Sequence, residues 1–354
     1  MRNLKIILTA CGCPGASTLI KMLKDNRERE IEIVGVDMDD QAIGRFWVDK
    51  FYRVPSADSD GYILKMLDLV KKEKPDILFP ESSYEVYPLA LNKEKFEKLG
   101  TKVVVSGPEP IAIANNKYEM YERLKKETNI DLPEYCYPQN LDEFIKFAQK
   151  LGYSEKAICF KPHIGKGSRG FRFIDPEIDR ETLLMKYKPN SRYMALEEFI
   201  TIFKDKKDFP KFILMERLEG MEYTTDPIAW KGEMLLCTTK TVEQARWGVI
   251  VKGELVDKPE LVEQTRKILK AIPLSYNVNI QFIGDKLIEI NPRVSTFIYQ
   301  PDLIAPYLSI KLALGEITPE QVKEYQNKID FGRRMVRYMD QVFWNPKSEH
   351  EQQN

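Results

Sequence analysis

Gln281-Phe282-Ile283-Gly284-Asp285-Lys286-Leu287-Ile288-Glu289-Ile290-Asn291-Pro292-Arg293 carries more information about this chain than any other segment. Polar and apolar residues alternate on both sides of its glycine, which predicts two β-strands joined by a short turn. We expect a loop over residues 284–286, with an odd number of residues, because a one-residue slip reverses the facing of every side chain. Gln281 then pairs with Glu289 and Asn279 with Asn291, while Ile280, Phe282, Ile288 and Ile290 fill the apolar face.

The polar face of this predicted hairpin has the chemistry of a cation site. Gln281, Glu289 and Asn291 each offer a side-chain oxygen, and oxygen ligands suit a hard cation such as Mg²⁺. The same pattern also fits an ordinary hairpin with one solvated face. Matching elements elsewhere in the chain are needed to decide between the two interpretations.

Length, charge and cysteine usage limit the class of protein. With 354 residues the chain is long enough for two or three domains. Lys plus Arg equals Asp plus Glu, at 54 each, so no net charge favours nucleic acid or an acidic membrane as a partner. No apolar run approaches the ~20 residues that span a bilayer, and the N-terminus lacks a signal-peptide cleavage pattern. Five cysteines without zinc spacing predict reduced thiols and a cytoplasmic location.

The order of the expected elements predicts an α/β fold with an α+β C-terminal part. Strands and helices alternate over the first hundred residues, which implies a parallel sheet with helices on both faces. Pro110 opens a helix that runs to about Thr128, and from Ala157 onward strands separated by glycine and polar turns predominate. The expected domains are 1–108, 109–215 and 216–345, followed by a disordered tail over 346–354.

A glycine turn follows the first expected strand. Thr9-Ala10-Cys11-Gly12-Cys13-Pro14-Gly15-Ala16 has the position of a dinucleotide fingerprint, with Asp37 at the end of the second strand. Only two of the glycines are present, and Pro14 removes an N–H that could face a phosphate. We therefore favour a turn that packs the domain or lines a substrate cleft over one that binds a nicotinamide or flavin cofactor.

A second glycine-rich loop, residues 165–170, follows a strand that ends in Lys161. The next element is a strand and not a helix, so the loop is not a Walker motif. Its glycines still allow backbone N–H groups to approach phosphate oxygens, with Lys161 and either Lys166 or Arg169 neutralising charge. The alternative is a flexible basic hairpin on the surface.

A third element lies between residues 214 and 223. Glu216 and Glu222 could accept hydrogen bonds from an adenine amino group and ribose hydroxyls, with the backbone near Leu218 reading the ring edge. Two glutamates near a glycine are also common on ordinary protein surfaces.

Taken in order, these elements resemble the ATP-grasp superfamily of carboxylate–amine ligases, above all its single-module proteins related to carbamoyl-phosphate synthase. The resemblance covers nearly the whole chain and includes Asn116-Lys117 in the first helix after the N-terminal domain. It implies a Rossmann-like domain before the ATP-grasp fold, and a small lid subdomain within that fold.

The resemblance also implies a role for each matching residue. Lys117 and Lys161 match the residues that hold ATP phosphates, and Arg293 matches an arginine beside the reacting phosphate. Lys240 lies on a strand that faces the phosphates in such folds, and Asp226 is a further candidate. The residues that match the family's lid are Gly165, Gly167, Ser168 and Gly170. Those that match its nucleotide pocket are Glu216, Leu218 and Glu222, and those that match its metal ligands are Gln281, Glu289 and Asn291.

The reaction implied joins a small carboxylate to a small amine. ATP and Mg²⁺, or Mn²⁺ in its place, would convert the carboxylate to an acyl phosphate, and the amine would then displace phosphate. The alternatives are a catalytically idle or regulatory ATP-binding homologue and a nicotinamide-dependent oxidoreductase. No nucleic acid or membrane partner is expected, and the resemblance leaves room for a homodimer.

The acceptor is expected near Arg293, between the N-terminal and last domains. An amino acid, a peptide or a sugar acid would each suit the sequence, which does not identify the substrate. The candidate wall residues are Gly12, Glu81, Ser82, Ser83, Glu85, Arg246 and Ser295. Those between residues 80 and 85 could equally be helix-capping groups.

Overall fold

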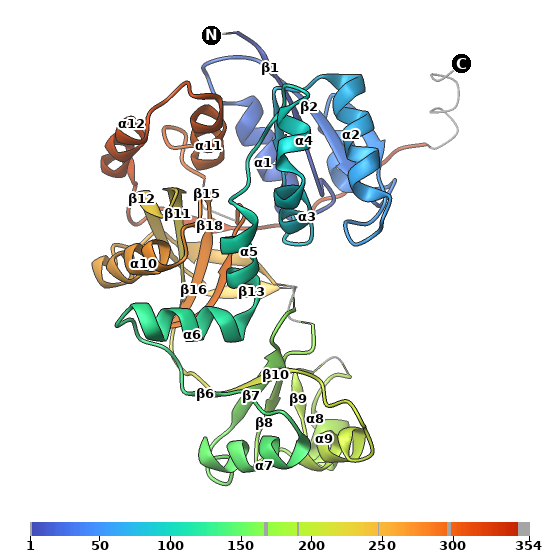
Figure 1. Cartoon of the computed structure of the whole chain (residues 1–354), viewed down its shortest axis with the longest axis vertical. Coiled ribbons are helices and arrows are strands. Elements are labelled where there is room, and N and C mark those ends of the chain that lie inside the picture. Colours follow the sequence, from blue (N-terminus) through green and yellow to red (C-terminus); the bar gives the residue numbers. More distant parts are fainter. Residues whose placement is uncertain (1, 166–168, 190, 247, 296–298, 346–354) are drawn as a thin grey trace.

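The structure is a computed structural model that describes residues 2–165, 169–189, 191–246, 248–295 and 299–345. Figure 1 shows three bodies along the long axis: an N-terminal α/β body, a central antiparallel sheet and a small sheet with helices at the far end. The predicted class, α/β with an α+β C-terminal part, is confirmed. The domain limits at residues 108, 215 and 345 remain predictions.

The N-terminal body is a parallel sheet with strand order β3-β2-β1-β4-β5. Its central strands are buried on both faces, as expected where helices cover both sides of a parallel sheet. The strand order reverses beside β1, so the carboxyl ends of β1, β2 and β4 open a crevice of the kind in which α/β sheets bind ligands. The elements are β1 Leu4–Leu8, α1 Ala16–Lys24, β2 Ile31–Asp37, η1 Ile43–Phe46, β3 Lys50–Arg53, α2 Tyr62–Glu73, β4 Ile77–Phe79, α3 Val86–Leu91, α4 Lys93–Glu97 and β5 Lys102–Val103.

The single helix expected from Pro110 to Thr128 is wrong, because the chain forms two helices, α5 (Pro108–Asn115) and α6 (Lys117–Glu127). Asn116 between them is extended, and its side chain accepts hydrogen bonds from the first turn of α6. A backbone bridge from Asn116 to Ile164 fixes the break. Lys117 is therefore the first residue of a helix and not an interior one.

The small sheet at the far end has order β6-β10-β7-β8-β9 and its own aromatic core. Phe144, Phe160, Phe199 and Phe212 are buried together there, apart from the two cores of the rest of the chain. This core holds the small sheet and its helices together, whereas Cys159, Ile213 and Met215 of the same strands belong to the core shared with the central sheet. Its elements are β6 Tyr135–Cys136, α7 Leu141–Lys150, β7 Ile158–Pro162, β8 Arg172–Ile174, α8 Arg180–Lys186, β9 Tyr193–Met194, α9 Leu196–Phe203 and β10 Phe212–Glu216.

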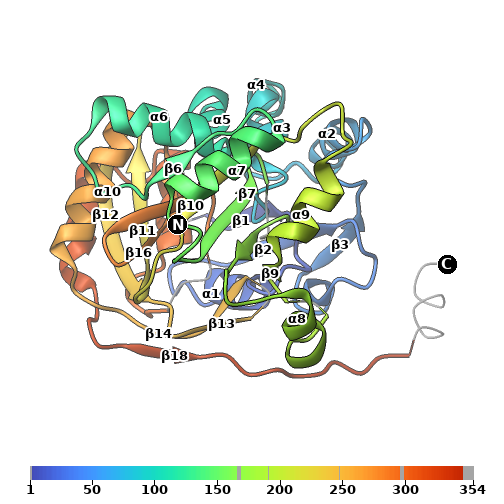
Figure 2. The same ribbon diagram turned by 90° about the horizontal axis from the view of Figure 1, so that it is seen from below.

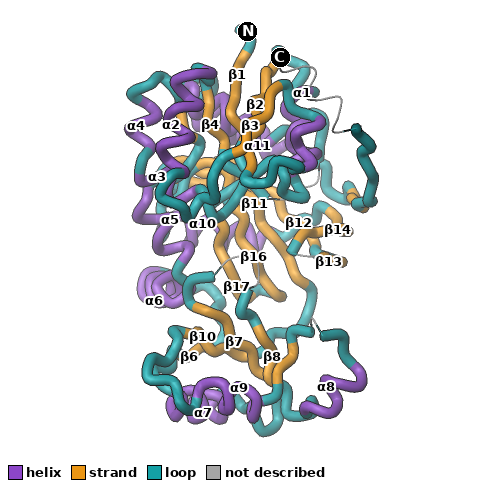
Figure 3. The backbone as a smooth tube through the Cα atoms, turned by 90° about the vertical axis from the view of Figure 1, so that its right-hand side faces the viewer, coloured by secondary structure: helices purple, strands orange, loops and turns teal. Residues whose placement is uncertain are grey.

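The central sheet has order β12-β11-β16-β17, and helices cover it (Figure 3). A second, three-stranded sheet of order β13-β14-β18 lies beside it. The elements are β11 Glu222–Trp230, β12 Glu233–Thr241, β13 Gln244–Arg246, β14 Val249–Glu254, α10 Pro259–Ala271, β15 Tyr276–Asn277, β16 Asn279–Ile283, β17 Lys286–Asn291, α11 Ala305–Leu314, α12 Pro319–Lys323, η2 Glu324–Lys328 and β18 Arg334–Val336.

The β16–β17 hairpin has the predicted side-chain pairing but not the predicted loop. Gln281 lies opposite Glu289 and Asn279 opposite Asn291, as expected. The loop has two residues, however, with a positive φ at Gly284, and a bulge between the paired positions 281 and 282 restores the register. Ile288 is the extra residue: it is half-buried, and Leu287 takes the core position predicted for it.

After β18 the chain continues across the molecule to the N-terminal body (Figure 2). Arg337 donates hydrogen bonds to the backbone carbonyls of Ile250 and Pro14, and Trp344 packs on Phe46. This segment ties the C-terminal sheets to the N-terminal body. The predicted tail over 346–354 lies outside the described residues. Among the helices that the structure describes, none has the length and apolar character needed to cross a membrane.

Candidate functional site

The polar face of the β16–β17 hairpin gathers oxygen atoms at one place. The amide nitrogens of Gln281 and Asn291 donate to the Asn279 side-chain oxygen at 3.4 and 3.5 Å, and Glu289 lies opposite Gln281. Over the residues that the structure describes, no group of three or more His, Cys, Asp or Glu residues could hold a metal ion. One carboxylate and two amide oxygens instead suit a hard cation that takes its other ligands from phosphate and water.

A buried ion pair lies beside this face. Lys240 of β12 is fully buried, and it donates hydrogen bonds to Asp226 of β11 and to Ser295. Asp226 also accepts hydrogen bonds from Ser295 and from the Asn279 amide, the latter at 3.0 Å. Burial lowers the pKa of Lys240, and Asp226 opposes that effect by stabilising the charged ammonium. The pair therefore fixes Asn279 and, through it, the predicted cation face.

Two lysines lie on the other side of the hairpin. The Lys161 ammonium, at the end of β7, donates to the carbonyl of Ile288 at 3.1 Å, and Tyr121 donates to the same oxygen at 3.0 Å. The bulge at Ile288 thus exposes a carbonyl that holds Lys161 in place. Burial, together with the charge of nearby Lys117, lowers the pKa of Lys161 to about 8. The Lys117 ammonium donates to the Gly165 carbonyl at 3.1 Å.

Glu289 lies at the electrostatic centre of these groups. Its charge raises the pKa values of Lys161 and Arg293, opposing the effect of burial on both, and it also raises the pKa of Glu222. Arg293 is directed into the space between the bodies, where its Nε donates to the Ser83 hydroxyl at 3.1 Å. The structure therefore brings together Lys117, Lys161, Glu222, Glu289 and Arg293 from four separate parts of the chain.

The predicted nucleotide residues fall into two groups. Glu216 and Leu218 line a cavity of about 920 Å³ at the connection between β10 and β11. Glu216 is already engaged there, because it pairs with Lys286 and accepts the Glu134 N–H at 2.8 Å. Glu222 does not line that cavity; burial raises its pKa, and Arg192 opposes the effect.

The glycine-rich loop is described only in part. Lys166, Gly167 and Ser168 lie outside the described residues. Gly170 has a φ of +74°, and a Cβ there would lie 2.7 Å from the Pro162 ring, so a larger residue would strain this turn. Arg169 does not turn toward Lys161: it donates to the Tyr84 hydroxyl in the N-terminal body and stacks on that ring.

The N-terminal glycine turn has no free amide at its first glycine. The Gly12 N–H donates to the Asp37 carboxylate at 2.7 Å, and a Cβ at Gly12 would approach that carboxylate within 2.9 Å. Among the described residues this amide is therefore used within the domain. The geometry supports the predicted packing and cleft-lining roles better than a pyrophosphate cradle.

A cleft of about 250 Å³ separates this turn from the hairpin. Of the expected acceptor residues, Gly12 and Glu85 line the neighbouring cavity, and Arg246 is exposed on β13 without lining the cleft. Sequence reasoning missed Tyr121 and Arg337, which act through contacts with distant segments and have no local motif. The cleft is lined by Cys13, Pro14, Gly15, Glu81, Ser82, Ser83, Tyr84, Gly248, Val249, Ile250, Asn279, Gln281, Arg293, Val294 and Ser295.

Family models match both ends of the chain. Residues 6–104 match the PylC-like N-terminal domain, and residues 208–335 match the ATP-grasp domain described as belonging to a biosynthetic pathway with the Ter operon. The PylC-like match covers the N-terminal body, and the ATP-grasp match, later in the sequence, includes the central sheet.

Known relatives match parts of this chain at low sequence identity. The carbamoyl phosphate synthase large chain of Clostridium acetobutylicum is 24% identical over 286 residues, which is 76% of this chain and 24% of that protein. The formate-dependent phosphoribosylglycinamide formyltransferase of Ignicoccus hospitalis is 24% identical over 207 residues, 57% of this chain and 47% of that protein. This chain thus spans less than half the length of either relative.

Solved structures share the fold. The biotin carboxylase domain of the Hydrogenobacter thermophilus 2-oxoglutarate carboxylase, in complex with MgADP, ADP and bicarbonate, superposes with a TM-score of 0.62 at 19% identity. The match covers 89% of this chain and 70% of that one.

Proposed function

We propose that this chain, which has an ATP-grasp domain homologous to that of the carbamoyl phosphate synthase large chain, is an ATP-dependent carboxylate–amine ligase. The observation that carries the proposal is the hairpin, where Gln281, Glu289 and Asn291 share one face between Lys161 and Arg293. The reaction would form an acyl phosphate, release ADP, and pass the acyl group to an amine with release of phosphate.

The described residues suit the charge changes of such a reaction. Lys117 and Lys161 would hold the transferred phosphate, and their burial strengthens their attraction for it. Arg293 would offset the charge that develops on the acyl phosphate at the cleft. Lys240 is held by Asp226 and would act by keeping the Asn279 side of the face in place.

Gln281, Glu289 and Asn291 would hold Mg²⁺, or Mn²⁺ in its place. When bound, the cation would neutralise negative charge on the phosphates. The sheet that contains β7 and β10 would close over the nucleotide and exclude water, because an acyl phosphate hydrolyses in an open site. Glu216, Leu218 and Glu222 would contact the base and ribose.

The test is release of ADP and phosphate from MgATP by the purified chain, screened against pairs of small carboxylates and amines. Glu289→Gln is expected to lower magnesium-dependent turnover by at least about a hundredfold, because it removes the one carboxylate of the face. Glu263→Gln on the exposed side of α10 is the matched control and is expected to keep wild-type turnover. Unchanged turnover in Glu289→Gln would reject the assignment.

The same screen separates an idle homologue from an enzyme. Binding of MgATP without release of ADP against every pair would favour a regulatory ATP-binding protein. We also propose that the chain is cytoplasmic and forms a homodimer. Light scattering of the purified chain tests the dimer.

A further inference from the structure

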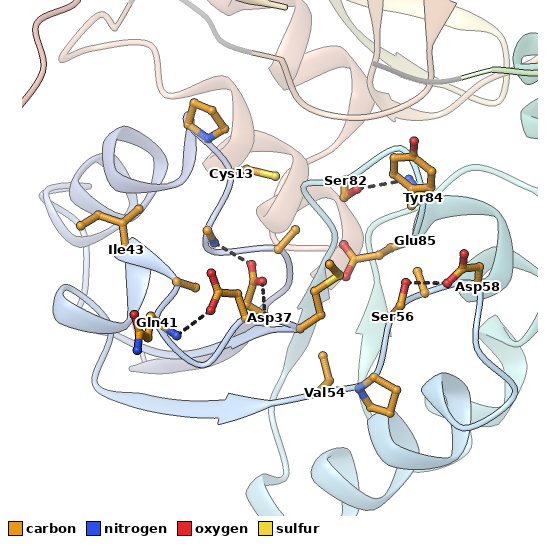
Figure 4. A pocket seen from close by; sticks show the side chains of 18 of the residues that line it. Cys13, Asp37, Gln41, Ile43, Val54, Ser56, Asp58, Ser82, Tyr84 and Glu85 are labelled. Carbon is orange, nitrogen blue, oxygen red and sulfur yellow. Dashed lines mark hydrogen bonds between the residues drawn. The ribbon is translucent and has the colours of Figure 1, made fainter. Parts of the chain in front are cut away.

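The cavity that neighbours the cleft has a volume of about 720 Å³ and opens at the carboxyl ends of β1, β2 and β4 (Figure 4). Apolar groups form much of its wall, among them Ala42, Ile43, Val54, Pro55 and Ala57. Such a wall suits an aliphatic body rather than a highly hydroxylated one.

The charged groups of this cavity are mostly negative. Asp37, Asp39, Asp58 and Glu85 line it, and Arg169 is the one cationic side chain among the described residues of its wall. Arg169 is engaged with the Tyr84 ring and hydroxyl. Four carboxyl groups against one occupied guanidinium disfavour a phosphorylated ligand and favour a cationic one.

The cavity adjoins the cleft beside Arg293. Cys13, Pro14, Ser82 and Tyr84 line both spaces. A ligand whose body lies against Val54 and Ala57 can therefore extend one end to the arginine, next to the predicted cation face.

Glu81 lies on the cleft side of this junction. It follows β4 and lines the cleft, and its Oε2 atom is buried without a hydrogen-bond donor among the residues that the structure describes. Buried polar atoms in folded proteins almost always have a partner, so an acceptor left open at a cleft indicates a donor that arrives with a ligand. An ammonium supplies three such donors and a compensating charge.

We propose that this joined space holds the amine substrate, and that the substrate is an unphosphorylated primary amine on an aliphatic body whose nitrogen contacts Glu81. The assignment rests on the proposed ligase function. Placed at Glu81, the nitrogen lies on the same cleft as Arg293, beside which the acyl phosphate would form. The remote end lies among Asp37, Asp39 and Asp58, where a second cation or a neutral group is tolerated.

The test measures binding by isothermal titration to the full chain, without turnover. The probes are 1,5-diaminopentane, 3-aminopropyl phosphate and 1,5-pentanediol, each with and without MgADP. The diamine is expected to bind, and the phosphate and the diol to bind at least about tenfold more weakly, because one lacks charge complementarity and the other lacks the ammonium.

Two variants locate the ammonium. Glu81→Gln is expected to weaken the diamine by at least about tenfold, whereas Glu94→Gln on exposed α4 leaves it unchanged. Asp58→Lys changes an exposed residue, so it tests the remote end even where Glu81→Gln does not fold; we expect it to shift preference from the diamine toward 3-aminopropyl phosphate.

Equal binding of the diamine to wild type and Glu81→Gln would overturn the proposal. Binding of 3-aminopropyl phosphate or 1,5-pentanediol to the wild type more tightly than the diamine would also overturn it. Because no ATP is consumed, Glu81-dependent diamine binding in a chain that never releases ADP would reject the ligase function and keep the amine site. Release of ADP by a chain whose diamine binding does not depend on Glu81 would keep the ligase function and reject this site.

Discussion

The hairpin end and the N-terminal end of the interdomain cleft differ in how their buried charges are partnered. At the hairpin end Lys240 pairs with Asp226, and Lys161 donates to the Ile288 carbonyl. At the N-terminal end Glu85 is held by Thr9 and Tyr62, but Glu81 Oε2 has no donor among the described residues. The first end is organised before any ligand arrives, whereas the second leaves an acceptor open.

This difference matches the two tasks of a ligase. The handling of phosphate and metal is the same in every turnover, and groups fixed in advance cost no reorganisation during the reaction. Substrate recognition instead requires polar groups that become satisfied only when the correct ligand binds, and an incorrect ligand then leaves them unpaired. The comparison therefore predicts opposite effects of mutation on stability at the two ends.

The largest effect is expected for Asp226→Asn at the organised end. It leaves Lys240, which is fully buried, without its partner charge, and breaking such a pair costs about 3 kcal/mol of unfolding free energy. Urea unfolding measures the loss. Glu263→Gln in the exposed pair with Arg266 is the control, with an expected change within ~0.5 kcal/mol. Equal losses in the two variants would contradict the account of the organised end.

A smaller effect, on ligand affinity, is expected from the pH dependence of Lys161. Its pKa is lowered to about 8, so the ammonium is charged below that pH and loses its proton as the pH rises through it. The affinity for MgATP should therefore fall above pH 8, by up to about tenfold per pH unit. Lys161→Arg stays charged and should remove the slope, although its affinity will be lower because the guanidinium has a different shape. Calorimetry between pH 7 and 9.5 checks both, and an equal slope in the variant would exclude Lys161 as its source.

The sequence predicts the hairpin pairing but not its loop. The alternation of side chains identifies the facing of Gln281 and Glu289, because burial enforces a period of two. It cannot reveal that Ile288 is an extra residue in a bulge, since the local pattern there is as apolar as in a regular strand. The carbonyl freed by the bulge is nevertheless what Lys161 and Tyr121 contact.

Other parts of the site depend on contacts between distant segments. The break at Asn116 is stabilised by a bridge to Ile164, and Arg337 reaches Pro14 across the molecule. Asn116 is a residue type that favours helix N-caps, but a cap residue alone does not reveal the bridge to Ile164, and Arg337 has no local signature. The charged residues of the cleft could be proposed individually, but which of them lacks a partner is visible only in the folded chain.

Tyr121→Phe is expected to reduce stability by about 1 kcal/mol. Its hydroxyl donates to the carbonyls of Leu287 and Ile288 at 3.2 and 3.0 Å, and the side chain is fully buried. Because the loss removes one support of the bulge, the affinity for MgATP should also fall through Lys161. Tyr338→Phe on the exposed segment after β18 is the matched control and should change neither. A stability loss without any change in affinity would separate Tyr121 from the site.

The smallest expected effect has the opposite sign and comes from Glu81→Gln. Burial and the nearby charges of Glu85 and Asp37 raise the pKa of Glu81, while Arg293 and Arg337 lower it by a lesser amount. The folded chain therefore holds this proton more tightly than the unfolded chain. Above the ordinary glutamate pKa the unfolded state ionises first, so the native side chain makes folding progressively less favourable as the pH rises, until the raised folded-state pKa is reached.

Glu81→Gln removes that penalty, and we expect it to be more stable than the wild type by ~0.5–1 kcal/mol at pH 8. The two should converge toward pH 4. Thermal unfolding at both pH values measures the difference, with Glu94→Gln as the control that should follow the wild type. A Glu81→Gln variant less stable than the wild type at pH 8 would mean that Glu81 belongs to a satisfied hydrogen-bond network like that of Asp226. The buried charges at both ends of the cleft would then be partnered before a ligand binds.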